Sequence, residues 1–290
     1  MQTIAVVGSE SFLAKNLITY LAKFAGAFRL KCYDYLPDSA APNYEQIDFT
    51  KTESLKKIDF SAERIVFFTG KTGTLKGFAE YKKFVEVNEL YLLNFLQAYV
   101  EAKSAARIIY PSSRLIFKPN VEKPVAENSP LEFKSVYAVN KYAAEQYLAV
   151  YGKNFAVDYV ILRICTPYGS LIDSDGSYGT FEIFNKQAKQ NGKVTIFGDG
   201  EQKKTYTDIR DVCEAFYRLI KAEKVKHDSY NLGGQDLSMN EAVAQIVAMN
   251  KAKTEHVPWP KEYLNVDGGS VFFDSGRFDE EFQMTYHPIV

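Results

Sequence analysis

Short apolar runs alternate with longer segments of helical periodicity along the first half of the chain. Thr3–Val7 reads as a buried strand, and apolar residues then recur at steps of three and four up to Leu21. Further strands are predicted at "RLKCYDY", "RIVFFTG" and "ARIIYPSS", with helices at about Phe84–Glu101 and Val136–Val150. Strands that alternate with helices in this way predict a parallel sheet covered on both faces. Right-handed crossovers would bring the carboxyl ends of the strands to one edge, where ligands bind.

The pattern changes after Tyr168. "DYVILRICTPYG" still reads as strand, but glycine and aspartate then cluster before helices predicted at about Thr180–Gln190 and Met239–Met249. "VTIFGDGEQKK" and "SYNLGG" are strand candidates, and the tail reads as irregular. We therefore expect an α/β protein with a Rossmann-like doubly wound parallel sheet over residues 1–165. Residues 166–290 would form mainly a smaller, substrate-binding lobe, with some segments returning to the sheet domain.

Composition excludes several classes of protein. The 290 residues include 35 basic and 36 acidic ones, so no net charge draws the chain to nucleic acid or to an anionic membrane. The three cysteines are widely spaced, which fits neither a disulfide framework nor a metal site. No apolar run reaches membrane-spanning length, and the chain enters a strand pattern at once. We expect a cytoplasmic protein without a metal.

The opening loop, "GSESFLA", predicts a phosphate-binding turn. Gly8, Ser11 and Ala14 have the spacing G-x-x-G-x-x-G with a small residue at each place, and a helix is expected to start near Phe12 and Leu13. A helix start binds pyrophosphate through its free amides and its dipole, and glycine allows close approach. Asp34 follows Ala14 by 20 residues, where an acid binds the adenosine ribose. The alternative is an ordinary turn with a surface aspartate.

A second motif lies in "SVYAVNKYAAEQYL". Tyr137 and Lys141 are four residues apart and share one helical face. They follow "IIYPSS", where Ser112 and Ser113 end a predicted strand. The alternative is a half-buried aromatic residue beside a solvated charge.

The order and spacing of these motifs resemble the extended short-chain dehydrogenase/reductase family of nucleotide-sugar epimerases and dehydratases. The resemblance covers nearly the whole chain and implies an enzyme with NAD as its cofactor. It assigns the catalytic roles to Ser113, Tyr137 and Lys141. The residues that it assigns to the cofactor are Gly8, Ser11, Phe12, Leu13, Asp34, Asp48, Phe49, Phe68, Thr69, Gly70, Lys71, Asn88, Ser112, Tyr137 and Lys141.

The residue types explain the chemistry that the resemblance implies. A tyrosine hydroxyl has a free pKa of about 10 and is a poor base at neutral pH. An adjacent ammonium and the cationic nicotinamide favour the phenolate. Tyr137 would take a proton from a sugar hydroxyl while hydride passes to NAD, Ser113 would hold the same oxygen, and Lys141 would also bind the cofactor's ribose.

Departures from the family pattern concern the substrate. The family's 4,6-dehydratases carry an acidic pair after the catalytic hydroxyl residue, whereas this chain has Arg114 and Leu115, which disfavours dehydration. Thr166 replaces an asparagine, and Lys204 replaces an arginine that grips the diphosphate in a bidentate manner. Phe197, in "IFGDGEQKK", falls in the segment that lines the nucleotide-sugar pocket of the family. The resemblance thus makes substrate-binding candidates of Arg114, Thr166, Phe197 and Lys204. A second phosphate-binding arginine has only Arg277 as a candidate.

The resulting hypothesis is an NAD-dependent epimerase of a nucleoside-diphosphate sugar that works through a transient keto-sugar. The alternative is an NAD(P)-dependent reductase of a nucleotide-linked 4-keto-sugar, although Asp34 would repel the 2′-phosphate of NADP. A non-catalytic dinucleotide-binding regulator is a third reading. Family members commonly dimerise through two helices, here about Phe84–Lys103 and Val136–Tyr151, so a homodimer is expected.

Overall fold

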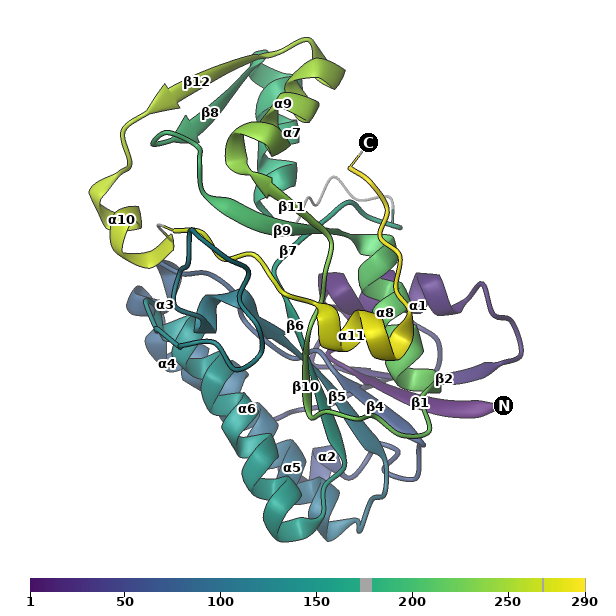
Figure 1. Cartoon of the computed structure of the whole chain (residues 1–290). Coiled ribbons are helices and arrows are strands. Elements are labelled where there is room, and N and C mark those ends of the chain that lie inside the picture. The colour runs from purple at the N-terminus through teal and green to yellow at the C-terminus, as the bar shows by residue number, and fades with distance from the viewer. Residues whose placement is uncertain (173–178, 268, 290) are drawn as a thin grey trace. The chain divides into compact units, whose positions relative to one another are not determined.

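A seven-stranded sheet dominates the first part of the structure, a computed structural model that describes residues 1–172, 179–267 and 269–289. Its strand order is β10-β6-β5-β4-β1-β2-β3 (Figure 1). The pairs β1–β2, β1–β4, β2–β3 and β4–β5 are parallel. The order 3-2-1-4-5-6 is that of a doubly wound Rossmann sheet, so the predicted fold class is confirmed. The strands are Gln2–Val7 (β1), Phe28–Asp34 (β2), Tyr44–Gln46 (β3), Arg64–Phe67 (β4), Arg107–Ser113 (β5), Tyr159–Ile164 (β6) and Ser229–Asn231 (β10).

Helices cover both faces of this sheet because its central strands are apolar on both sides. In β1, Ala5 and Val7 belong to the cluster that includes residues of α2 (Thr52–Leu55), α5 (Tyr91–Glu101) and α6 (Val136–Phe155). Alternation along the strand turns Ile4 and Val6, which are also fully buried, to the other face. That face is covered by α1 (Phe12–Leu21), as Figure 1 shows.

The predicted long helix is present, with a local change of pitch. Residues 81–101 run through α4 (Tyr81–Val85), a π-helical segment η1 (Glu86–Leu90) and then α5. A short helix, α3 (Lys76–Ala79), precedes them. A π-helical turn inside an α-helix is often found at functional sites because it re-aims the side chains around it.

The chain divides into two compact units. Unit 1 comprises residues 1–112, 135–162 and 216–229, and unit 2 comprises residues 113–134, 163–215 and 230–290. Unit 2 contains a three-stranded sheet, β11-β9-β7, and a two-stranded sheet, β12-β8. Its strands are Thr166–Tyr168 (β7), Lys193–Phe197 (β8), Lys203–Asp208 (β9), Gln235–Ser238 (β11) and Lys253–Val257 (β12).

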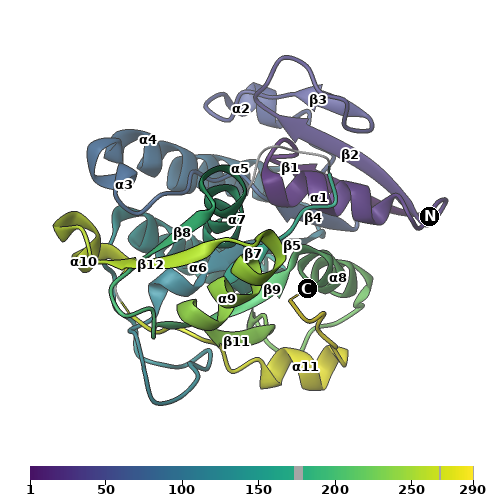
Figure 2. The ribbon, with the colours of Figure 1, turned by 90° about the horizontal axis from the view of Figure 1, so that it is seen from above.

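A separate core lies inside unit 2. Helices α7 (Thr180–Asn191) and α9 (Met239–Asn250) lie beside β8 and β12 in both views (Figures 1 and 2). Their buried side chains, among them Phe184 and Ile246, join Val194 and Tyr206 of the strands in one apolar cluster. Unit 2 therefore has a hydrophobic centre of its own.

The remaining helices are Arg114–Ile116 (η2, a 3₁₀ turn), Ile209–Lys221 (α8), Lys261–Asp267 (α10) and Gly276–Phe282 (α11).

The expectation of an irregular tail was wrong. The segment after α9 contains β12, α10 and α11. Strand β12 pairs in parallel with β8, which precedes it by about sixty residues, and its register places Lys253 opposite Lys193. In α11, the fully buried Phe278 packs edge-on against Tyr230 at 5.5 Å between ring centroids. These partners are distant in sequence, and local periodicity therefore does not reveal the elements.

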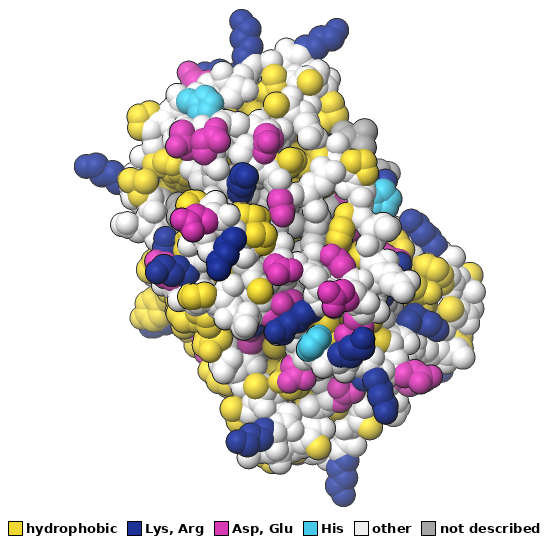
Figure 3. Space-filling model, in the orientation of Figure 1, with side chains coloured by type: hydrophobic (Ala, Val, Ile, Leu, Met, Phe, Trp, Pro, Cys, Tyr) yellow, Lys and Arg dark blue, Asp and Glu magenta, His cyan; other side chains and the backbone are white. Residues whose placement is uncertain are grey.

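The surface carries charges of both signs. On the face shown in Figure 3, basic and acidic side chains are interspersed over the molecule. Among the described helices, none is long and apolar enough to cross a membrane.

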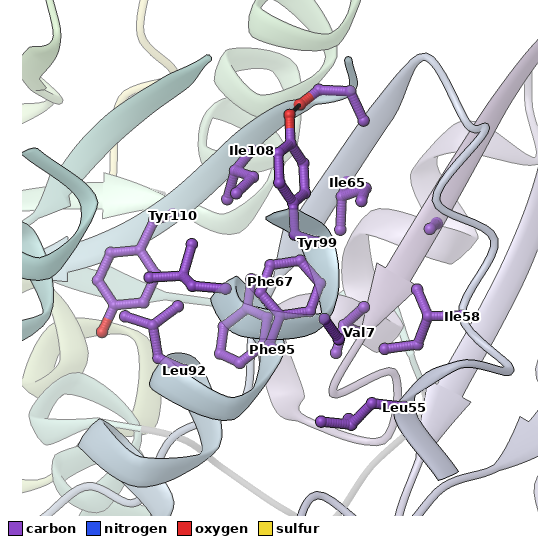
Figure 4. Close-up of a cluster of buried hydrophobic side chains, with 14 of the residues drawn as sticks. Val7, Leu55, Ile58, Ile65, Phe67, Leu92, Phe95, Tyr99, Ile108 and Tyr110 are labelled. Atoms are coloured by element: carbon purple, nitrogen blue, oxygen red, sulfur yellow. Dashed lines mark hydrogen bonds between the residues drawn. The ribbon is translucent and has the colours of Figure 1, made fainter. Parts of the chain in front are cut away.

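The aromatic centre of the sheet's core yields the first prediction. Phe95 is fully buried beside Phe67 (Figure 4), at 4.8 Å between ring centroids. The ring centroid of Phe60 lies 5.7 Å from that of Phe95. Phe95→Ala should lower the free energy of unfolding by about 3–5 kcal/mol because it leaves a cavity that rigid rings cannot close. Chemical denaturation measures the loss. Phe78→Ala, at a side chain that is 54% exposed, is the control and should change stability by less than about 1 kcal/mol; equal losses would contradict the assignment.

Candidate functional site

The turn after β1 depends on one glycine. Gly8 has φ +80°, and a Cβ built there would lie 2.6 Å from the backbone nitrogen of Thr69. The amides of Gly8 and Ser9 both donate to the carbonyl of Tyr33, at 2.8 and 3.1 Å. Any other residue at position 8 would force the loop after β4 away and strain the backbone. Gly8 therefore brings the ends of β1, β2 and β4 together.

The other two positions of the loop do not need glycine. Ser11 has φ −68°, an ordinary value, and is the N-cap of α1, where its hydroxyl oxygen accepts from the amide of Ala14 at 3.4 Å. An accepting hydroxyl keeps its own hydrogen for donation. Ala14 is fully buried against the sheet, as the packing position requires. The loop is therefore a capped helix start with small side chains.

A cavity of about 360 Å³ lies beside this loop, within unit 1. It brings together eight of the residues predicted to hold a cofactor, which come from the ends of β1, β2 and β4 and the segments after them. These are Gly8, Ser11, Asp34, Phe49, Phe68, Thr69, Gly70 and Lys71. The buried Oγ1 of Thr69 makes no hydrogen bond within the described part of the chain. A hydroxyl of this kind in a cavity wall is available to a ligand.

Asp34 is buried at the end of β2. Its Oδ2 accepts from the amide of Glu10 at 3.0 Å, and its Oδ1 accepts from the amide of Tyr35 at 2.7 Å. Burial raises the pKa of Asp34, and repulsion from Glu10 adds to the rise, while the backbone amides counter it. The carboxylate is thus fixed in position beside the loop, as a ribose-binding acid has to be.

Other predicted cofactor residues lie outside the cavity wall. Phe12 and Leu13 form the first turn of α1 and are half-buried. Asp48 closes a local turn by accepting from the hydroxyl of Thr50 at 2.6 Å and from its amide at 2.9 Å. The hydrogen bonds from Thr50 lower the pKa of Asp48 to about 2. Ser112 is buried, and its hydroxyl makes no hydrogen bond within the described part of the chain.

Asn88, from η1, holds the backbone of Lys71, a residue of the cavity wall. Its Oδ1 accepts from the amide of Lys71 at 2.8 Å, and its Nδ2 donates to the carbonyl of Lys71 at 3.0 Å and to Asn140 Oδ1 at 3.4 Å. Asn140 in turn donates to Glu89, the next residue of η1, which also accepts from the hydroxyl of Tyr147. These bonds join the loop after β4 to α6 through the π-helical turn.

Tyr137 and Lys141 occupy successive turns at the start of α6, and both are buried. The ammonium of Lys141 donates to the carbonyl of Pro111 at 2.8 Å and to the hydroxyl of Tyr110 at 3.1 Å. A Cβ built on Gly70 would lie 3.8 Å from the same ammonium, so Lys141 lies beside Gly70, a residue of the cavity wall. Burial lowers the pKa of Lys141 to about 8, against a small opposing effect of Glu145. The lysine is therefore an internal cation and not a solvated one.

Ser113 ends β5, directly after Ser112, and is buried. Its hydroxyl oxygen accepts from the amide of Leu115 at 3.2 Å and caps the short η2 turn that Arg114 begins. The side chain of Arg114 is buried as well.

In unit 2, three of the predicted substrate residues gather around Cys165. Thr166 directly follows Cys165 in the chain. The backbone of Lys204 forms a parallel β-bridge with Val271, and the carbonyl of Val271 accepts from the Cys165 thiol at 3.3 Å. Burial raises the pKa of that thiol, whereas the charges of Arg114 and Lys204 oppose the rise. Two buried cations and a hydroxyl thus share one region, a composition that suits an anionic ligand.

Phe197 and Arg277 have other surroundings in unit 2. Phe197 ends β8 in the two-stranded sheet, with ring centroids of Trp259 at 5.5 Å and Tyr263 at 6.0 Å. Arg277 forms an ion pair with Glu127 at 3.3 Å.

Sequence reasoning missed six residues of the cavity wall: Glu10, Tyr35, Leu36, Lys83, Val87 and Tyr91. Glu10 is the third residue of the predicted loop, and its place in the motif was the available signal. Lys83 comes from α4 and Tyr91 begins α5, where Tyr91 stacks on Phe49 at 5.0 Å between ring centroids. Nothing local marked these two, because only the packing of the helices brings them to the cavity.

Comparisons with known proteins agree with this architecture. Residues 4–233 match the model of the NAD dependent epimerase/dehydratase family. The chain spans about half the length of the curated relatives that it matches at 28–31% identity. CDP-paratose 2-epimerase of Salmonella typhi, for example, is 28% identical over 171 residues, which cover 51% of this chain and 51% of that protein.

Two solved structures share the fold. UDP-glucuronic acid 4-epimerase from Bacillus cereus, in complex with UDP-glucuronic acid and NAD, has a TM-score of 0.83 at 21% identity and covers 100% of this chain and 95% of its own. A dTDP-glucose 4,6-dehydratase from Streptomyces venezuelae with NAD bound has a TM-score of 0.83 at 20% identity, over 100% and 92% of the two chains.

The buried ammonium of Lys141 yields a prediction about pH. Its pKa of about 8 in the folded state lies below the 10.5 of a free lysine, so between these values the unfolded state binds more protons. The free energy of unfolding should therefore rise with pH across this window. Lys141→Met removes that contribution. Urea denaturation from pH 7.5 to 10.5 should show the wild type gaining roughly 2–3 kcal/mol relative to the variant. Parallel pH profiles would show that Lys141 is not desolvated.

Proposed function

The chain belongs to the NAD-dependent epimerase/dehydratase family, and we propose that it is an epimerase of a nucleoside-diphosphate sugar with NAD as its cofactor. One observation carries the proposal: the ammonium of Lys141 borders the wall of the cavity that the Gly8 turn opens, 3.8 Å from where a Cβ of Gly70 would stand. Helix α6, which carries Tyr137 and Lys141, thus approaches the loop after β4, and that loop shares the cavity with the loop after β1.

The residues of the cavity fit a dinucleotide. The amides at the start of α1 and the cap residue Ser11 suit a diphosphate, which a helix start attracts. Asp34 stands where an acid can accept from ribose hydroxyls, and Thr69 offers an unused buried hydroxyl. Lys71 and Lys83 line the same wall, and their ammonium groups form ion pairs with Glu80 and Glu86 at 2.9 Å. The missing loop glycines do not oppose this assignment, since only position 8 has a backbone that requires glycine.

The nicotinamide, when bound, supplies a hydride acceptor and donor. The chain's own residues handle the proton. Tyr137 takes it from a sugar hydroxyl and later returns it. With a pKa of about 8, Lys141 is still mostly protonated at pH 7, so one turn away along α6 it provides the positive charge that favours a phenolate at Tyr137. Ser113, at the end of β5, holds the sugar oxygen.

We assign the nucleotide-sugar to residues of unit 2. The buried cations Arg114 and Lys204, with the hydroxyl of Thr166, suit a diphosphate and its polar sugar, and the ring of Phe197 suits a flat base. Arg114 also takes the place of the acidic residue that an elimination of water would use, which favours epimerisation over dehydration. The three cysteines, all described, are buried thiols and not disulfides, so a reducing cytoplasm is the proposed location.

Tyr137→Phe gives the decisive test of the mechanism. The change removes one hydroxyl and keeps the ring, so folding and NAD binding should stay close to those of the wild type. Epimerisation of nucleoside-diphosphate sugars, followed by NMR, should fall 10²–10⁴-fold with the loss of proton transfer. Ser113→Ala should lose less, because water can replace one hydrogen bond, whereas Lys141→Met should lose both rate and NAD affinity.

Tyr151→Phe is the matched control, since it removes a hydroxyl from the same helix about four turns further on. It should turn over at the wild-type rate. A Tyr137→Phe protein as active as this control would refute the mechanism. An epimerase turns over with NAD that it retains. If the enzyme instead consumes one molecule of reduced cofactor for each molecule of product, it is the keto-sugar reductase.

Association through the catalytic helix is a further part of the proposal. Leu90 of η1 and Val139 of α6 are 48% and 49% exposed, and Val150 and Phe155 of α6 are exposed as well. Apolar side chains of this size on neighbouring helices fit a self-complementary interface.

Light scattering at micromolar concentration should report a dimer for the wild type. Leu90→Lys combined with Val139→Lys should shift it to a monomer that still binds NAD, because buried lysines in the interface would lack partners. Lys82→Leu, an exposed change on α4, is the control and should leave the dimer intact. A wild type that stays monomeric would refute this interface.

A further inference from the structure

Glu10 places a second carboxylate at the Asp34 end of the cavity. It is the third residue of the loop that begins at Gly8, and it lines the same cavity as Asp34. Its backbone amide donates to Asp34 Oδ2 at 3.0 Å, so the two residues are in direct contact. The two carboxylates also repel each other, since the charge of Glu10 contributes to the raised pKa of Asp34. A ligand bound by Asp34 therefore also meets the field of Glu10.

The Glu10 carboxylate is held in its charged form. Lys15 lies 2.7 Å from its Oε2, and the hydroxyl of Ser39 donates to its Oε1. Burial alone would raise the pKa of Glu10, but these two hydrogen bonds and the charge of Lys15 together outweigh burial and lower it. The side chain is only 13% exposed, so solvent screens its charge less than it would on the surface.

The ion pair also fixes the position of a cation. Lys15 belongs to the first turn of α1, next to the helix start that suits a phosphate. Its side chain is 43% exposed, and its ammonium points back to Glu10. Glu10 thus adds a negative charge near Asp34 and keeps Lys15 from serving as a phosphate-binding cation.

We propose that Glu10 is a specificity-determining residue which, together with Asp34, excludes dinucleotides that carry a phosphate on the adenosine ribose. The inference rests on the proposed function, because it takes the cavity as the dinucleotide site. A 2′-phosphate would bring about two negative charges against two fixed carboxylates, and their repulsion is strong at short range in a partly buried site. NAD, whose ribose bears only hydroxyls there, meets no such repulsion.

Glu10 has a structural contact that the test has to preserve. Glu10 accepts from the hydroxyl of Ser39, and that hydroxyl accepts from the amide of Ala41 at 2.9 Å. Glu10 therefore helps to fix the position of the segment after β2. Glu10→Gln keeps the length of the side chain and an oxygen for Ser39, and it removes only the charge. Glu10→Ala would remove both and would not separate the two roles.

The experiment is calorimetric titration of the cofactor-free protein with NAD and with NADP, which needs no turnover. Glu10→Gln should bind NADP roughly five- to thirtyfold more tightly than the wild type, with NAD affinity unchanged within about twofold. Asp34→Asn should also favour NADP, and the double variant should gain more than either. Adding Lys15→Met to Glu10→Gln should reverse part of the gain, because it removes the ammonium that Glu10→Gln releases toward the phosphate. Glu53→Gln, which removes a glutamate paired with Lys56 on α2, should change neither affinity.

Each contrary result has one meaning. If Glu10→Gln leaves the NADP affinity unchanged while Asp34→Asn raises it, Asp34 discriminates alone and the inference is wrong. Equal loss of NAD and NADP binding in Glu10→Gln would show a purely structural role and would also overturn it. A wild type that binds NAD but shows no preference over NADP refutes the inference and leaves the proposed function standing. A wild type that binds neither dinucleotide refutes both.

Discussion

The close approach of two backbone segments at Gly8 is the constraint on which the site depends. A Cβ at this position would collide with the backbone of Thr69, and the positive φ would strain any other residue. The contact joins the ends of β1 and β4, while the amides of the same turn bond to the carbonyl of Tyr33 at the end of β2. Three strand ends are thereby fixed around one cavity. The rest of the loop tolerates substitution because its remaining requirements, a helix cap and a small packing residue, are met by Ser11 and Ala14.

Buried polar groups link this cavity to the helix that carries Tyr137 and Lys141. Asn88 holds both the amide and the carbonyl of Lys71, and through Asn140 it reaches α6. The π-helical turn places Asn88 and Glu89 on the side where these partners lie. Because buried polar groups need partners, a substitution of any residue in this hydrogen-bond network leaves a polar group of its neighbour without a hydrogen bond. The ammonium of Lys141 is held separately, by the carbonyl of Pro111 and the hydroxyl of Tyr110.

Unit 2 combines an apolar cluster of its own with buried positive charges. Its apolar cluster is built from two helices and strands of two small sheets, and the cations Arg114 and Lys204 are buried beside Cys165. Two buried cations near the hydroxyl of Thr166 have a composition that suits an anionic ligand, which supports the proposed assignment of this unit to an anionic substrate. In the proposed assignment the charges of the site residues are divided, with carboxylates beside the cofactor cavity of unit 1 and cations in the substrate region of unit 2.

The sequence by itself determined the parallel sheet, the long helices and eight residues of the cavity wall, because strand and helix periods and the loop motif are local properties. It also placed Tyr137 and Lys141 on one face of a helix. Tertiary structure alone decided the strands and helices of the tail, whose partners are distant in sequence, as β12 and β8 show. It likewise decided that Lys141 is a buried cation, that Lys83 and Tyr91 line the cavity, and that Glu10 stands beside Asp34. Burial and neighbouring charge are properties of the packed chain, and no pattern along the sequence contains them.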